Sequence, residues 1–294
     1  MNHSINQKHH YNNVISLTWC QNDAYVFWIV ACTASVMHFS GFLTPPNAHQ
    51  LFLCNLCLGL PHGATDIIRL KKLSQTTQKP LWLAIFIYCL VVSAAICFWI
   101  MQPTLALIIF LLISGVHFGQ DWKKDNKIHG FILGMGLLSI PCLAQPTSCY
   151  QLFSLLTFGQ STVIFLHPLF MISLFSAMII ATYQLNQQPW IAFEFAALTL
   201  IGYLLDPLYF FTIYFCSLHS MRHIRRITES KLMKKQHIYP LIITIVCCMF
   251  LTAITHQSLS QYRPISIEKL IEFRTLFILL FALTVPHMLL ESQK

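Results

Sequence analysis

Long apolar stretches, separated by short polar segments, run along most of the 294-residue chain. Stretches such as Ala24–Leu43, Leu81–Met101 and Leu270–Leu290 approach or reach the roughly 20 apolar residues that one helix needs to cross a bilayer. They lack the alternation typical of strands, so they predict helices. The pattern predicts an all-α, polytopic transmembrane helix bundle of about ten spans. The predicted spans cover residues 24–43, 48–67, 81–101, 103–119, 129–145, 163–185, 190–205, 208–225, 238–256 and 270–290.

Two segments fall outside these spans. Residues 1–23 are polar and are expected to form a tail before a single transmembrane helical domain over residues 24–294. The segment Tyr150–Thr162 is too short to cross the bilayer, so we expect it to lie in the interface or to re-enter the membrane.

Composition and charge agree with a lipid-embedded chain. Hydrophobic residues make up 56% and charged residues 10% of the sequence, and the mean hydropathy is +0.62. With ten spans, the basic runs Arg69–Lys79, Lys123–Lys127 and Arg222–Lys235 fall on one side, which is then expected to be cytoplasmic. Orientation and anionic headgroups account for the net charge of +8, so no nucleic-acid partner is expected.

Most of the eleven cysteines lie inside apolar runs, where cysteine behaves as a small hydrophobic residue. Cys54 and Cys57 have metal-binding or redox spacing, but no second pair completes a zinc site. Cys142 and Cys149 bracket a polar turn and could be oxidised if that turn faces the periplasm.

Five of the fourteen histidines lie at the predicted cytoplasmic ends of spans, in one layer. They are His62, His117, His219, His223 and His287. An imidazole in the bilayer is costly and usually marks a site or a pathway. His219 and His223 are four residues apart, so they project from one helical face, where they could chelate a single metal. A pair of interfacial histidines beside neighbouring arginines is the alternative interpretation.

An acid follows three of these histidines by four residues: Asp66 after His62, Asp121 after His117 and Glu291 after His287. A metal-bound imidazole commonly donates its second N–H to a carboxylate or carbonyl. These acids are therefore candidate outer partners of the histidines. Alternatively, they mark membrane exits and pair with nearby cations, and for Glu291 this alternative is at least as well supported.

Neutral nitrogen ligands suit iron, copper or zinc better than magnesium or calcium. Several imidazoles around one ion would leave positions open for a reactant if the ion takes five or six ligands. A reactant for a site in this setting has to arrive from lipid or through a hydrophobic tunnel, which the 23 phenylalanines could line.

From about residue 48 onward, the chain resembles the Brp/Blh family of bacterial and archaeal membrane proteins, the β-carotene 15,15′-dioxygenases. The resemblance is carried, in order, by Pro61-His62-Gly63-Ala64 with Asp66, His117-Phe118-Gly119 with Asp121, His219-Ser220-Met221-Arg222-His223, and Pro286-His287-Met288.

The resemblance implies Fe(2+) held by His62, His117, His219 and His223. His287 matches a motif of that family but is not assigned as a ligand; like Asp66, Asp121 and Glu291, it is a candidate outer partner. The resemblance also implies oxygen-dependent cleavage of the central double bond of β-carotene into two retinals, in a multi-pass protein of the bacterial inner membrane. An opsin could take up the product. Arg222 points to another helical face than the paired histidines, so we interpret it as a contact with lipid headgroups.

Two other classes of protein would use the same residues. A membrane b-type cytochrome places histidines on different helices as axial haem ligands, and an intense Soret band would identify it. A proton-relay transporter would use the histidines and acids as carriers, and it should purify without stoichiometric iron.

Overall fold

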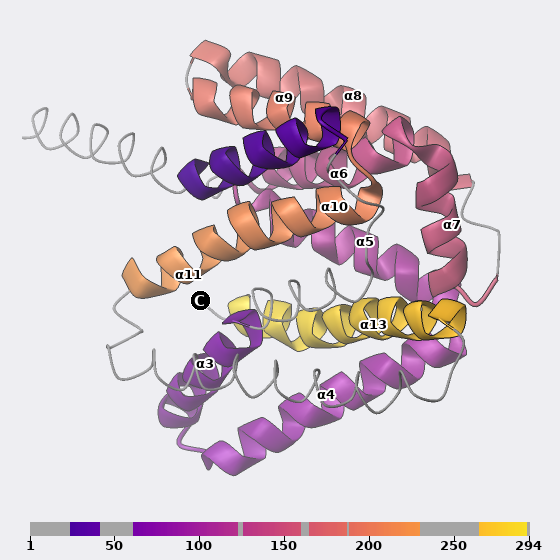
Figure 1. Ribbon diagram of the computed structural model, residues 1–294. Helices are drawn as coiled ribbons and strands as arrows, with labels where there is room; N and C mark the ends of the chain where they lie inside the picture. The colour runs from indigo at the N-terminus through magenta and orange to yellow at the C-terminus, as the bar shows by residue number, and fades with distance from the viewer. Residues whose placement is uncertain are drawn as a thin grey trace, which may run out of the picture.

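The computed structural model describes residues 24–41, 61–122, 126–159, 165–186, 188–229 and 265–292. Regular structure in these ranges is entirely helical (Figure 1), which confirms the all-α prediction. The helices are Ala24–Phe39, α3 (Pro61–Thr77), α4 (Leu81–Met101), α5 (Pro103–Gly119), α6 (Lys127–Ala144), α7 (Pro146–Leu156), α8 (His167–Tyr183), the 3₁₀ turn η2 (Gln184–Asn186), α9 (Pro189–Leu204), α10 (Pro207–Ile213), the π-helical η3 (Tyr214–His219), α11 (Ser220–Glu229) and α13 (Ile265–Glu291).

Three of the described helices are long and apolar enough to cross a membrane: α4, α6 and, within α13, Phe273–Glu291. Large apolar side chains such as Phe39 and Phe175, 75% and 70% exposed, point away from the bundle. Exposed apolar surface on this scale fits lipid as the surrounding solvent.

Several helices end where proline and polar residues interrupt the apolar pattern. Gln102 separates α4 from α5, and Pro103 occupies the first turn of α5, where its missing N–H costs nothing. The bounds of both helices match the predicted spans. The chain turns in the same way at Gln145, after which Pro146 begins α7.

Helix structure extends beyond the C-terminal end of the second predicted span, 48–67. Helix α3 begins at Pro61 and continues to Thr77, through the polar stretch that contains Arg69, Lys71 and Lys72. These long basic side chains favour helix, so loss of hydrophobicity does not end the helix. The predicted tail at 1–23, the predicted span 238–256 and the Cys54/Cys57 pair lie outside the described residues.

Close packing of α5 against α6 depends on glycines. A Cβ at Gly119 would overlap the backbone carbonyl of Gly130, and a Cβ at Gly134 would overlap that of Gly115. Small residues allow the two backbones to approach closely, as is common between membrane helices. The contact fixes the end of α5, where His117 lies.

The segment α10–η3–α11 is one continuous helix with a π-helical stretch in its middle. The side chain of Asp206 accepts a hydrogen bond from Leu208 N (2.8 Å) and caps its start. The π-helical stretch ends at His219, the first of the paired histidines, so it alters the helical register of the residues that lead up to the pair. Such stretches are frequent at functional sites.

Helix α3, helix α11 and the C-terminal end of α13 gather at one end of the bundle, whereas α7 lies at the other end (Figure 1). Consequently, the ends of α5 and α13 that carry His117 and His287 meet the start of α11, which follows His219.

Candidate metal centre

Four buried imidazoles from three parts of the chain converge at this end of the bundle: His117, His219, His223 and His287. The ring centroids of His117 and His219 lie 4.8 Å apart, and those of His117 and His287 lie 5.1 Å apart. The centroid of His223 lies 5.3 Å from that of His287 and 6.5 Å from that of His219. The four rings thus form one cluster of neighbouring imidazoles.

The separation of two of the rings is compatible with a shared metal ion. An ion bonded to a ring nitrogen at about 2.1 Å lies about 3.2 Å from the ring centroid, so rings on opposite sides of it are about 6.4 Å apart. The centroids of His117 and His223 are 6.4 Å apart. In addition, Nε2 of His117 lies 3.2 Å from Nε2 of His219. Two facing nitrogens at this distance share either a proton or a cation.

A buried carboxylate orients one of these rings. Oδ2 of Asp121 lies 2.8 Å from Nδ1 of His219 and also accepts a 2.8 Å hydrogen bond from the Tyr214 hydroxyl. An ionised carboxylate only accepts hydrogen bonds, so Nδ1 of His219 carries the proton and Nε2 presents its lone pair. Asp121 therefore hydrogen-bonds to His219, which is 98 positions away in sequence. The prediction from the four-residue spacing had paired it with His117.

A second carboxylate orients His287 in the same way. Oδ1 of Asp66 lies 2.8 Å from Nδ1 of His287, and Oδ2 accepts a 3.0 Å hydrogen bond from the Tyr88 hydroxyl. Nε2 of His287 is then the nitrogen with the lone pair. His287, which the sequence analysis assigns as an outer partner, lies in the ring of imidazoles and is oriented like His219.

Glu291 faces two of the imidazoles and one arginine. Its Oε2 lies 3.7 Å from Nδ1 of His117 and 3.9 Å from Nε2 of His287, while Oε1 lies 3.6 Å from Arg69. One ligand atom each from Glu291, His117 and His287 lie within 4.8 Å of one another, as ligands of a single ion would. The predicted spacing of His287 and Glu291 on one helical face is therefore present, and the alternative of an ion pair with Arg69 is present as well.

His62 lies in the first turn of α3, one turn before Asp66. Its side chain is outside the described residues, so its predicted role as a ligand stays a prediction. The position of Asp66 against His287 brings this turn of α3 to the cluster.

Comparison with known proteins identifies the family. The family model described as "Beta-carotene 15,15'-dioxygenase" matches residues 53–293. A curated relative, the beta-carotene 15,15'-dioxygenase of uncultured marine bacterium 66A03, is 30% identical over 249 residues, which cover 79% of this chain and 88% of the relative. The chain belongs to the β-carotene 15,15′-dioxygenase family. The resemblance inferred from the histidine motifs is thus confirmed. No solved structure matches the chain.

The matched range of this β-carotene 15,15′-dioxygenase family member contains every histidine and acid of the cluster. Helix Ala24–Phe39 lies before the match, yet Phe27 and Ala31 belong to the same hydrophobic core as Phe118. This helix is therefore packed into the bundle that carries the site.

Arg222 is not the headgroup contact that the sequence analysis predicts. It is 4% exposed, and its guanidinium pairs with Oε1 of Glu194 on α9 at 2.6 Å and donates to the backbone carbonyl of Asp121 at 3.2 Å. The other oxygen of Glu194 accepts from Trp122 Nε1 at 2.9 Å. Arg222 points toward α9, as expected for a helical face other than that of the paired histidines. On that face, however, it meets Glu194 of α9 and not lipid.

Four polar residues that support the cluster were not among the predicted site residues. They are Tyr88, Trp122, Glu194 and Tyr214. Glu194 could have been identified from the sequence, because it is an acid within an otherwise apolar span and a buried acid in a membrane is energetically costly. The two tyrosines carry no comparable signal, since tyrosine is common in apolar helices.

An apolar cavity approaches the cluster from inside the bundle of this family member. Its volume is about 90 Å³, and its lining includes Phe110, Ser114, Phe118, Phe211 and Phe277. The ring of Phe118 lies 4.8 Å, centroid to centroid, from that of His219. Phe118 therefore contacts both the cavity and the histidine cluster.

Cys142 and Cys149 lie deep in this cavity wall and are buried, at 1% and 4% exposure. Their Sγ atoms are 2.8 Å apart, and both cysteines are free thiols. The two thiols are therefore in contact. The polar turn between them in the sequence is the short junction of α6 and α7.

Proposed function

We propose that this protein is an iron-dependent oxygenase that uses O2 to cleave the central double bond of β-carotene, giving two molecules of retinal. The activity for which the family and the 30% identical relative are named supports this assignment. The observation in this chain that carries the proposal is the cluster of four imidazoles, two of which are fixed at Nδ1 by buried carboxylates.

We assign His117, His219, His223 and His287 as the residues that would hold the ion, with His62 kept as a predicted further ligand. Uncharged imidazoles suit iron, and Fe(2+) would supply the redox chemistry by which O2 is activated. The chain supplies the orientation of the rings. Asp121 and Asp66 hold the Nδ1 protons of His219 and His287 and so keep both Nε2 lone pairs directed at the centre.

The spacing of the imidazoles disfavours a b-type cytochrome. Two axial ligands at about 2 Å from haem iron have their nitrogens about 4 Å apart, with the porphyrin between them. Nε2 of His117 and Nε2 of His219 are 3.2 Å apart, so a porphyrin does not fit between this pair.

The apolar cavity accounts for the choice of a hydrocarbon substrate. Aromatic and aliphatic walls offer β-carotene nothing to hydrogen-bond, so the position of the cleaved bond follows from how the rigid polyene packs along the cavity. At about 90 Å³ the cavity is smaller than the roughly 300–1,000 Å³ usual for ligand sites, so its walls must move apart to admit substrate.

We place the protein in the bacterial inner membrane, with the histidine cluster toward the cytoplasm. The described cations Arg69, Lys71, Lys72 and Lys127 lie at or near the end of the bundle that carries the cluster, which is the pattern of cytoplasmic ends. Retinal formed there would enter the bilayer, from which an opsin can take it up.

Expression in a bacterial host that accumulates β-carotene tests the proposal. We expect the orange colour to fade and retinal to appear in the extract, and the purified protein to contain stoichiometric iron. The matched control is the His219→Ala variant at equal expression. Colour that persists with well-expressed, iron-loaded protein would show that the substrate or the reaction is a different one.

Replacing Asp121 with asparagine should lower the rate of retinal formation by about 10–100-fold, because the amide is a weaker acceptor for the Nδ1 proton of His219. Iron should also be lost more readily to a chelator. Asp206→Asn is the matched control, since Asp206 caps α10 and asparagine caps equally well. If Asp121→Asn keeps both its rate and its iron, Asp121 does not support the ligand.

A further inference from the structure

A second apolar site lies outside the histidine cluster, in a groove of about 420 Å³ between α3, α4 and α13. Its walls include Leu70, Leu73, Leu83, Ile87 and Leu290. The volume falls within the roughly 300–1,000 Å³ typical of small-molecule sites. The mechanism proposed above makes no use of this groove.

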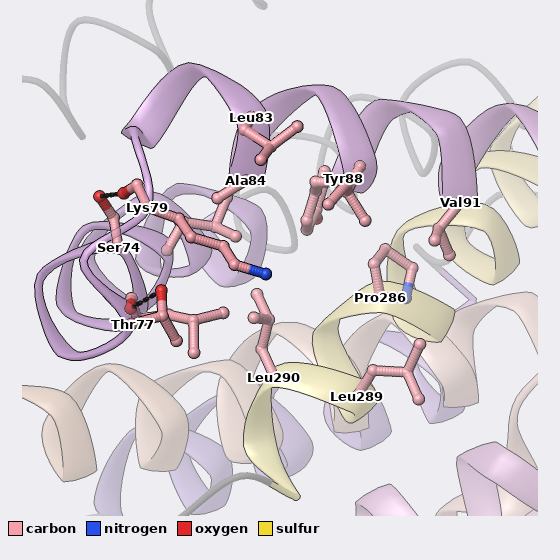
Figure 2. A pocket seen from close by; sticks show the side chains of 13 residues that line it. Ser74, Thr77, Lys79, Leu83, Ala84, Tyr88, Val91, Pro286, Leu289 and Leu290 are labelled. Carbon is pink, nitrogen blue, oxygen red and sulfur yellow. Dashed lines mark hydrogen bonds between the residues drawn. The ribbon is translucent and has the colours of Figure 1, made fainter.

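One end of the groove is polar. Ser74, Thr77 and Lys79, from the end of α3 and the turn after it, complete the lining there. Figure 2 shows the Lys79 side chain extending between α4 and Leu290, with its amine inside the groove. The hydroxyls of Ser74 and Thr77 donate to the backbone carbonyls of Lys79 (2.6 Å) and Leu73 (2.8 Å), so the Lys79 ammonium is the lining donor directed at a ligand.

The groove adjoins the histidine cluster through one hydrogen-bonded carboxylate. Tyr88 lines the groove, and its hydroxyl donates to Asp66, whose other oxygen holds Nδ1 of His287. Pro286, which also lines the groove, directly precedes His287. The groove and the histidine cluster are therefore neighbours that share the wall formed by Tyr88, Asp66 and the start of the Pro286-His287 turn.

The two cavities differ in the same way as the substrate and the product of the proposed reaction. Among the described residues, none that lines the inner cavity beside Phe118 is charged, which suits a hydrocarbon without polar groups. The groove combines apolar walls with one ammonium group, which suits an apolar chain that ends in a hydrogen-bond acceptor. Cleavage of a polyene creates such a molecule, because each half gains a terminal carbonyl oxygen.

We propose that the groove is a product site, where the polyene aldehyde binds with its chain along Leu83 and Leu290 and its carbonyl oxygen accepts a hydrogen bond from Lys79. The proposal rests on the proposed function for the identity of the aldehyde. It assigns Lys79 and the α3–α4 turn to product binding and release.

Reductive trapping tests where the aldehyde binds and needs no turnover. All-trans-retinal is added to the full-length protein in phosphatidylcholine nanodiscs with cyanoborohydride. A lysine amine and the aldehyde lose water to form an imine, and hydride from the cyanoborohydride reduces its C=N bond to a stable secondary amine, which peptide mass spectrometry locates. Lys71 and Lys72, which are exposed on the neighbouring helix α3, are the internal controls.

We expect Lys79 to be labelled more than about tenfold over Lys71 or Lys72, because a bound aldehyde has a high effective concentration at that amine. Equal labelling of the three lysines would overturn the product site. Loss of Lys79 labelling when phosphatidylglycerol is included would overturn it in favour of an anionic lipid as the occupant.

A blocking variant provides a second test. Ala84→Trp fills the groove from α4 and should remove the preferential labelling of Lys79 and slow the release of product in steady-state turnover. Ala94→Trp, on the exposed side of the same helix, should change neither. If Ala84→Trp labels and turns over like Ala94→Trp, the groove is not the product site. Failure of the wild-type protein to cleave β-carotene would instead contradict the proposed function and leave the labelling result unaffected.

Discussion

Replacing His219 with alanine is expected to reduce retinal formation to an undetectable level and to strip the purified protein of most of its iron. His219 combines three features of a ligand: its ring is fully buried, its Nδ1 is held by Asp121, and its Nε2 faces that of His117 at 3.2 Å. Loss of the imidazole would remove one proposed ligand of the ion and leave Asp121 with one donor fewer in a buried site.

The measurement pairs retinal analysis by chromatography with metal analysis of the same preparation. His38→Ala is the control, because His38 is exposed on helix Ala24–Phe39. His117, His223 and His287 should behave like His219 when they are replaced. A fully active variant at any of the four positions would remove that residue from the ligand set.

Replacing Arg222 with methionine is expected to destabilise the folded protein by about 3–5 kcal/mol, because it leaves Glu194 buried without its cation. The two side chains are 4% and 2% exposed and pair at 2.6 Å, so water cannot replace the lost partner easily. Activity should fall as well, since Arg222 also binds the backbone carbonyl of Asp121. Unfolding in detergent, followed by circular dichroism, measures the loss.

The double variant Arg222→Met/Glu194→Gln distinguishes an unpaired charge from lost packing. Removing both charges should restore much of the stability that the single change costs. Lys127→Met, at an exposed cation on α6, should leave stability nearly unchanged. A single variant as stable as Lys127→Met would mean that Glu194 is neutral or hydrated in the folded protein.

The all-helical fold and the histidine layer could be predicted because both follow from short stretches of sequence. Apolar runs of helix length predict spans without knowledge of their neighbours, and the bounds of α4 and α5 follow directly from Gln102 and Pro103. The distance of each histidine from the next cation predicts its depth. The depth of His117, His219 and His287 along their helices therefore agrees with their convergence.

The pairing of acids with histidines could not be predicted, because it depends on how the helices are rotated against each other. A spacing of four residues suggests that Asp121 serves His117, yet the packing of α5 against η3 turns Asp121 toward His219. The prediction that Arg222 contacts lipid headgroups was wrong for the same reason. Its helical face was inferred correctly, whereas the presence of Glu194 on that face is a property of α9 and of tertiary packing.

The hydrogen bond between Asp66 and His287 joins residues that are 221 positions apart and so sets the order of assembly. During synthesis, α3 enters the membrane long before α13, and the loop between them closes only after the intervening helices have inserted. Until α13 has been made, a nascent chain therefore lacks His287, one of the proposed ligands. For the proposed iron centre, loading of the ion is expected to follow translation, and a chain stalled before α13 should hold iron poorly.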